Sequence, residues 1–284
     1  MKSDFFSVKK CLNCNGSILN LEKPVVMGIL NLSPDSFYDG GRYSQVDMAT
    51  ERIELMIAQG ASIVDIGAYS SRPGAQNIND EEELKRLLPI LDKLYKYNSQ
   101  IVFSIDTFRA QIAKIAVKDF GVSIVNDISG GAMDEKMFDT IASLNVPYIL
   151  MHMQGKPQNM QVNPEYREVV EDIIKFFDAK VYELKKLGVH DIILDPGFGF
   201  GKTIDHNYEL LRRLESFKIF GLPILVGLSR KSMIYKFLNC SPEQALHGTT
   251  ILNTVAIQKG ANILRVHDVA EAKQAIDLIS KLNL

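Results

Sequence analysis

The chain has 284 residues, of which 46% are hydrophobic and 23% are charged, and its formal net charge is −2. These values lie near the averages of globular proteins, so they exclude a disordered, collagen-like or disulfide-scaffold chain. The near-neutral balance, without a block of like charges, also argues against a nucleic-acid partner.

The sequence indicates a cytoplasmic protein without a membrane partner. A membrane-spanning helix needs about 18 consecutive apolar residues, and no such run is present. Asp4, Lys9 and Lys10 lie where a secretory signal would need an apolar core. Three cysteines are too few for a disulfide framework, which is typical of a reducing compartment.

Short runs rich in Val, Ile and Leu recur along the chain, and each is followed by a polar turn and an amphipathic segment. Continuous apolar runs are typical of strands buried on both faces, and their alternation with helices indicates parallel pairing. The predicted strands are residues 25–30, 62–66, 101–105, 122–125, 147–151, 191–194, 223–228 and 262–266. The predicted helices are residues 46–59, 81–97, 111–120, 133–144, 165–187, 206–217, 245–259 and 270–282.

Eight such units predict an α/β protein with one (β/α)8 barrel domain over residues 1–284. Residues 1–24 fit no unit, and we expect them to form a hairpin that closes the bottom of the barrel. An open doubly wound sheet is the alternative, but the segment after the first strand lacks the glycine fingerprint of that fold.

Several short motifs suggest other chemistries but are incomplete. Residues 195–203 resemble a phosphate-binding loop, yet Pro196 and Lys202 stand where the nucleotide-binding motifs need glycine. Residues 227–231 lack the last glycine of a nucleophile elbow. Cys11 and Cys14 form one C-x-x-C without further zinc ligands nearby, so we expect ordinary thiols, with a redox or metal role as the alternative.

Nearly every predicted strand ends in a polar or charged residue, and barrel active sites lie at those ends. Capping of the following helix is the alternative for any single position, but the convergence of eight positions favours a site. In chain order the strand ends carry Asn31, Asp65, Asp106, Asn126 with Asp127, Met151 with His152, Asp195, Ser229 with Arg230 and Lys231, and Arg265 with His267.

Asp106, Asn126 and Asp195 can face one interior volume. Because no arginine obviously pairs with all of them, we expect a ligand with several N–H donors, such as the edge of a pterin or guanine. Lys231 would donate to that ring and Arg265 would stack on it.

A second group of residues at the barrel mouth predicts an anion site, because barrels often bind phosphate near the last strand. Its members are Asn31, Arg72, Arg265 and His267. Together the two regions predict a heterocycle joined to phosphate as the ligand.

The ordered set of motifs along the chain resembles the dihydropteroate synthases. The motifs are MGILNLSPDSF at 27–37, DGG at 39–41, SSRPGA at 70–75, SIDT at 104–107, NDISGG at 126–131, LMHM at 150–153, DPGFGFGK at 195–202, GLSRKS at 227–232 and RVH at 265–267. One departure is Tyr69, where the family commonly has a carboxylate. The role of that position is therefore open.

The resemblance implies a (β/α)8 homodimer that acts as a transferase in folate biosynthesis. The implied reaction joins 6-hydroxymethyl-7,8-dihydropterin pyrophosphate to p-aminobenzoate and gives 7,8-dihydropteroate and pyrophosphate. Small molecules are then the substrates, Mg²⁺ is the cofactor, and the displacement is largely dissociative without a covalent protein intermediate.

The resemblance also implies roles for single residues, with Asp106, Lys231 and Arg265 as the catalytic set. The pterin would be held by Asp106, Asn126, Met151, Asp195, Lys231 and Arg265. The phosphates would contact Ser71, Arg72, Arg265 and His267, and Asn31 would bind Mg²⁺. The p-aminobenzoate side would consist of Phe37, Pro73, Phe200, Ser229 and the Lys231 stem.

Two alternatives stay open at this point. A pterin-binding methyltransferase would act on methyltetrahydrofolate with a corrinoid protein partner, but it would not need the cationic residues Arg265 and His267. A non-catalytic pterin-binding protein would be expected to have lost site residues.

Residues 31–43 and 67–79 are long and polar, so we expect them to close as lids and to order the binding of the substrates.

Overall fold

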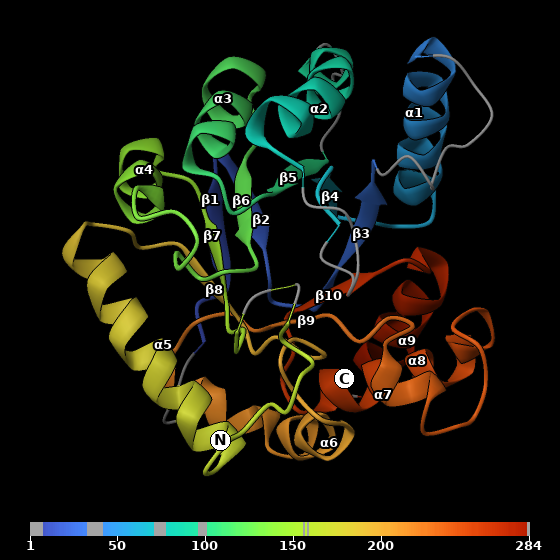
Figure 1. Cartoon of the computed structure of the whole chain (residues 1–284). Helices are drawn as coiled ribbons and strands as arrows, with labels where there is room; N and C mark the ends of the chain where they lie inside the picture. Colours follow the sequence, from blue (N-terminus) through green and yellow to red (C-terminus); the bar gives the residue numbers. More distant parts are fainter. Residues whose placement is uncertain are drawn as a thin grey trace.

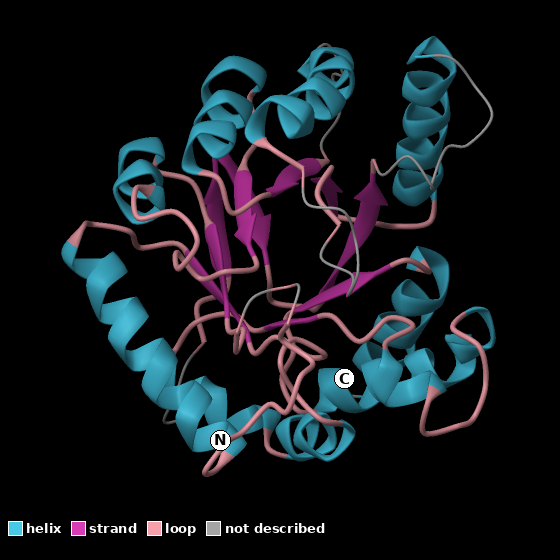
Figure 2. Cartoon of the chain, in the orientation of Figure 1, coloured by secondary structure: helices cyan, strands magenta, loops and turns pink. Residues whose placement is uncertain are grey.

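The strands form one parallel barrel that is surrounded by helices (Figures 1 and 2). The computed structural model describes residues 8–32, 42–70, 78–95, 101–155, 157 and 159–282. Every predicted barrel strand is present within these ranges. The strands are β3 (Val25–Asn31), β4 (Ile63–Gly67), β5 (Val102–Asp106), β6 (Ile124–Asp127), β7 (Tyr148–Met151), β8 (Ile192–Asp195), β9 (Leu225–Val226) and β10 (Ile263–Val266).

Parallel pairing runs around the barrel in the order β8-β7-β6-β5-β4-β3-β10-β9. The two ends of this order meet at a parallel bridge between Leu194 and Ile224, where the Leu194 N–H donates to the Pro223 carbonyl at 2.8 Å. The sheet therefore closes on itself, and the predicted barrel is confirmed over the open doubly wound sheet.

The helices cover the outside of the strands, and the main apolar core lies between the two layers. Among the described residues no helix has the length and apolar character that crossing a membrane requires. The helices are α1 (Arg42–Ala58), α2 (Asp80–Tyr95), α3 (Ala110–Phe120), α4 (Met137–Leu144), α5 (Val169–Lys186), α6 (Ile204–Arg212), α7 (Ser232–Tyr235), α8 (Leu246–Gln258) and α9 (Val269–Leu282).

The helix predicted over residues 206–217 is divided in the structure. The α-helix α6 ends at Arg212, and a 3-10 helix follows over Leu214–Phe220. The buried residues Leu214 and Phe217 are three positions apart, a spacing that suits an α-helix and a 3-10 helix equally. The apolar pattern therefore could not reveal the change.

The predicted N-terminal hairpin is present and closes the bottom of the barrel. It consists of β1 (Cys11–Cys14) and β2 (Ser17–Asn20), joined by Asn15 and Gly16, whose φ angles of 53° and 90° suit the tight turn of a two-residue hairpin. Its apolar side chains pack against the first inward residues of the barrel strands. This bottom cluster contains Leu12, Cys14, Leu19, Leu21, Met27, Ile63, Val102, Ile124, Ile149, Ile193, Leu225 and Ile263.

The two cysteines of the C-x-x-C lie on opposite faces of β1. Cys11 is exposed, whereas Cys14 is buried in the bottom cluster. Burial raises the pKa of the Cys14 thiol to about 12, so it stays protonated at neutral pH. This geometry favours ordinary thiols over a redox or metal pair.

Candidate functional site

The strand register brings the predicted polar residues to one end of the barrel. Gly67 of β4 is level with Asn31 on one side and with Asp106 on the other, and Asp106 is level with Asn126. On the next pair of strands Met151 is level with Asp195. These residues all lie at the carboxyl ends of their strands, which is the active-site face of such barrels.

A largely buried ion network crosses the interior of this end. The Arg265 guanidinium donates from Nε to Asp65 Oδ2 and from Nη2 to Asp106 Oδ2, both at 2.7 Å. Sequence reasoning found no arginine that obviously pairs with all of Asp106, Asn126 and Asp195, and the structure shows Arg265 bonded to one of them, Asp106. Burial alone would lower the pKa of Arg265, but Asp65 and Asp106 raise it well above its ordinary value, so the guanidinium is permanently charged.

Asp65 belongs to this network but was absent from the predicted set of ligand-binding residues. Its carboxylate is fully buried, and Oδ2 also accepts from the Asn126 side chain at 2.9 Å. Its other oxygen has no hydrogen-bond partner among the described residues. A charged residue inside a fully buried strand was the signal that could have identified it.

The bond to Asp65 decides which atom Asn126 presents to a ligand. The Asn126 amide nitrogen donates to the carboxylate, so its carbonyl oxygen remains as an acceptor. An acceptor at this position suits a ligand that carries N–H donors.

The carboxylates of Asp106 and Asp195 are both harder to ionise than in water. Burial raises the pKa of Asp106 to about 7, although Arg265 opposes the shift. Burial also raises the pKa of Asp195, against the influence of Lys231 and of the Gly197 N–H, which donates to Asp195 at 2.7 Å. A ligand with N–H donors would supply partners that stabilise the ionised form of both.

Lys231 lies beside Asp195 at the end of the β9 segment. Its ammonium group donates to the Phe198 carbonyl and lies 4.7 Å from the centre of the Phe200 ring. Burial lowers the pKa of Lys231 to about 8, and the Asp195 carboxylate opposes that shift. The arrangement combines a hydrogen-bond donor with an aromatic surface.

The loop that carries Phe198 and Phe200 is held by a second buried lysine, Lys202. The Lys202 ammonium donates to the carbonyls of Gly197 and Phe200 at 2.8 and 3.0 Å and contacts His152 Nδ1 at 3.1 Å. Burial lowers the pKa of His152 to about 2, so the ring is neutral and its Nδ1 can accept a hydrogen bond from the Lys202 ammonium. Sequence reasoning treated Lys202 as a mismatch to nucleotide-binding motifs and as the end of a family motif, but gave it no role.

An apolar cluster provides a surface for a flat ring next to these polar groups. Met151, Phe108 and Ile128 are buried in it, and Phe200 and Tyr69 are partly buried beside them. The Tyr69 ring packs edge-on against Phe108 with 4.9 Å between ring centres. The residue that replaces the usual carboxylate therefore contributes an aromatic wall.

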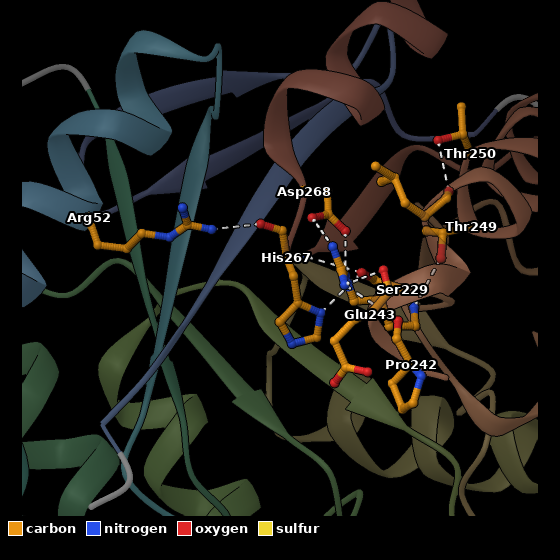
Figure 3. A network of polar contacts seen from close by, with 10 residues as sticks. Arg52, Ser229, Pro242, Glu243, Thr249, Thr250, His267 and Asp268 are labelled. Atoms are coloured by element: carbon orange, nitrogen blue, oxygen red, sulfur yellow. Dashed lines mark hydrogen bonds and ion pairs between the residues drawn. The ribbon is translucent and has the colours of Figure 1, made fainter. Parts of the chain in front are cut away.

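The predicted phosphate ligand His267 contacts Ser229. Ser229 Oγ lies 3.0 Å from His267 Nδ1 and accepts the His267 backbone N–H at 3.2 Å. The serine hydroxyl can therefore donate to Nδ1, which leaves Nε2 of the neutral ring as a donor. Figure 3 shows Arg52 of α1 reaching the His267 carbonyl, at 2.8 Å.

The remaining predicted residues can be placed only in part. Asn31 ends β3 and is half-buried at the barrel mouth. Phe37, Ser71, Arg72 and Pro73 lie outside the described residues, as do most of the two predicted lid segments. Within the described ranges no group of three or more His, Cys, Asp or Glu side chains could hold a metal ion.

Comparisons with known proteins agree on one family. The family model described as "Pterin binding enzyme" matches residues 27–267. Dihydropteroate synthase of Escherichia coli K12 is 40% identical over 270 residues, which cover 94% of this chain and 95% of the relative.

Two solved structures share the fold at high similarity. Yersinia pestis dihydropteroate synthase in a sulfonamide drug complex has a TM-score of 0.90 and 38% identity, over 96% of this chain and 99% of the other. The Xanthomonas albilineans synthase in complex with 7,8-dihydropteroate has a TM-score of 0.86 and 34% identity, over 96% and 98% of the two chains. The chain therefore belongs to the pterin-binding enzyme family, among the dihydropteroate synthases.

Proposed function

We propose that this transferase condenses 6-hydroxymethyl-7,8-dihydropterin pyrophosphate with p-aminobenzoate to give 7,8-dihydropteroate and pyrophosphate. The observation that carries the proposal is the set of acceptors formed by Asp106, Asn126 and Asp195, beside the donor Lys231. The names and bound product of the related synthases support the same activity.

The proposed binding mode follows from the polarity of these groups. The Asp106 and Asp195 carboxylates and the Asn126 carbonyl accept from the pterin N–H groups, while Lys231 donates to the pterin carbonyl or ring nitrogen. Arg265 is fixed at two points, so its planar face is available to stack on the ring. Met151 supplies apolar contact on the pocket wall.

The chemistry needs charge stabilisation more than proton transfer. Arg265 and His267 stabilise the charge that develops on the departing pyrophosphate, with Ser71 and Arg72 as further proposed contacts. Phe200, Ser229 and the Lys231 stem, with Phe37 and Pro73, position the p-aminobenzoate ring so that its amine attacks the methylene carbon. No protein nucleophile is required.

The donor set around Asn31 fits a loosely held hard cation. Asn31 offers one neutral oxygen, so most ligands of Mg²⁺ would come from the substrate phosphates and water. When bound, the ion would neutralise charge on the pyrophosphate. We expect EDTA to abolish turnover, added Mg²⁺ to restore it, and dialysed enzyme to retain no stoichiometric metal by elemental analysis. A metal that survives dialysis would contradict this proposal.

Incubating the protein with pterin pyrophosphate, p-aminobenzoate and Mg²⁺ tests the function directly. We expect a product with the mass of 7,8-dihydropteroate and none when p-aminobenzoate is omitted. Folded protein that gives no product would refute the assignment. Methyl transfer from methyltetrahydrofolate to a corrinoid protein, measured in parallel, tests the alternative activity.

We also propose a homodimer, as the family resemblance implies. Ile251 on α8 and Leu278 on the adjacent α9 are 63% and 70% exposed, so these two helices offer apolar side chains to a subunit interface. Sedimentation equilibrium should give twice the chain mass. The cytoplasmic location expected from the sequence stays a prediction.

A further inference from the structure

The turn between Ser229 and Lys231 has an unusual backbone conformation at Arg230. The φ angle of Arg230 is 55°, in the left-handed region that residues other than glycine, asparagine and aspartate adopt rarely. Such a conformation persists only when surrounding contacts impose it. Its neighbour Ser229 contacts His267, the proposed phosphate ligand, so whatever fixes Arg230 also positions that contact.

The contacts that impose this conformation come from the Arg230 side chain and amide. The guanidinium forms a two-point ion pair with Asp268, with Nε to Oδ2 at 2.9 Å and Nη2 to Oδ1 at 2.8 Å. Nη1 donates to the Glu243 carbonyl at 3.1 Å, and the backbone N–H donates to Thr249 Oγ1 at 3.1 Å. A lysine could not reproduce this planar arrangement.

Two adjacent loops are joined here by two consecutive pairs of residues. Ser229 contacts His267, and the next residue of each loop forms the Arg230–Asp268 pair. In Figure 3 Ser229, His267 and Asp268 lie together, with Thr249 close by on α8. The ion pair therefore fixes the distance across which Ser229 and His267 meet.

We propose that the Arg230–Asp268 pair is a positioning clamp that keeps Ser229 in contact with His267, so that His267 is oriented to bind the pyrophosphate group. This proposal rests on the proposed function, because it concerns the part of the same site that would bind pyrophosphate. A partly exposed ion pair adds little to global stability. The alignment of groups that stabilise charge is much more sensitive to small displacements.

The isosteric variant Asp268→Asn tests the clamp on the full-length enzyme. Calorimetry would measure binding of inorganic pyrophosphate with Mg²⁺ and, separately, of 6-hydroxymethylpterin without phosphate. We expect pyrophosphate affinity to fall tenfold or more. Pterin affinity should change less than threefold, since Asp106, Asn126 and Asp195 are untouched and the Phe198 carbonyl holds the Lys231 ammonium separately.

The matched control is Asp277→Asn, because Asp277 forms an ion pair with Lys273 on α9, the helix that begins directly after Asp268. We expect both affinities of this variant to stay within twofold of the wild type. Unchanged pyrophosphate affinity in Asp268→Asn would overturn the clamp. An equal loss for both ligands would overturn it as well, because that pattern indicates general distortion of the site.

Variants of Arg230 separate the side chain from the backbone conformation. Arg230→Gly permits the left-handed φ without the ion pair, and we expect it to lose pyrophosphate affinity as Asp268→Asn does. Wild-type affinity in Arg230→Gly would mean that the backbone alone suffices, against the clamp. These are binding measurements, so they remain valid even if the wild type makes no dihydropteroate.

Discussion

At the scale of single residues, Asp195 offers the most direct test of the pterin contacts. Asp195→Asn keeps the size of the side chain but replaces an acceptor by a donor that faces ligand N–H groups. Loss of a charge-assisted hydrogen bond should weaken binding of pterin pyrophosphate by about 2–4 kcal/mol in calorimetry. The free energy of unfolding should change little, because replacing the buried carboxylate by an amide also removes the cost of burying its charge.

Asp191→Asn is the control for this experiment, since Asp191 precedes the same strand and pairs with Lys9 at the opposite end of the barrel. It should leave pterin affinity unchanged. If Asp195→Asn also binds the ligand normally, the role of Asp195 is confined to the turn at Gly197.

Asp106 should make stability depend on pH. Its pKa is about 7 in the folded protein against an ordinary value of 3.8, because burial disfavours the charged form. The folded state thus binds a proton at Asp106 more tightly than the unfolded state does. The stabilisation that this proton gives to the folded state is complete below about pH 4 and is lost as pH rises to about 7. Urea unfolding of wild type and Asp106→Asn can be compared at pH 4, 5.5 and 7.5. Between pH 4 and 7.5 the free energy of unfolding of the wild type should fall by up to about 4 kcal/mol relative to that of the variant. If the free energies of unfolding of the two proteins changed equally with pH, this prediction would be contradicted.

At the scale of elements, the N-terminal hairpin should support stability without affecting the site. Leu19 is 7% exposed in the bottom cluster, whereas its neighbour Ile18 is 70% exposed. Leu19→Ala should lower the free energy of unfolding by about 2–4 kcal/mol and leave pterin affinity unchanged. Ile18→Ala should cost less than about 0.5 kcal/mol. Similar losses in both variants would show that the hairpin does not pack as described.

The strands were predictable because burial on both faces leaves a continuous apolar run in the sequence. Helix ends were less predictable, as the division after Arg212 shows, because apolar spacing near three residues fits two helix types. The four-residue helix α7 is too short to show any periodicity. It was therefore not expected.

The site was predictable where a polar residue ends a strand, since the barrel topology brings strand ends together. The pairing of Arg265 with Asp65 and Asp106 was not, because it joins residues far apart in the sequence across the barrel interior. Lys202 was missed for a different reason, since three of its four acceptors are backbone carbonyls that no sequence pattern identifies.

At the scale of the whole molecule, the position of the site predicts ordered binding. The proposed pterin contacts lie at strand ends of the barrel, whereas two of the proposed p-aminobenzoate contacts, Phe37 and Pro73, belong to the predicted lid segments 31–43 and 67–79. We expect p-aminobenzoate to bind appreciably only after pterin pyrophosphate, or pyrophosphate with Mg²⁺, is bound. Calorimetric titrations of p-aminobenzoate with and without pyrophosphate test this. Equal affinity in both would mean that the site is preformed.

The closed bottom of the barrel also constrains product release. Apolar side chains of the hairpin and the strands fill that end, so ligands exchange only through the opposite mouth. In the proposed binding mode the pterin ring occupies the innermost position, and every other ligand lies between it and the solvent. We therefore expect product release to be ordered, with pyrophosphate leaving before the larger product withdraws its pterin end. Dihydropteroate then competes with the incoming pterin substrate for the same empty barrel, and the end product of one turnover limits the start of the next.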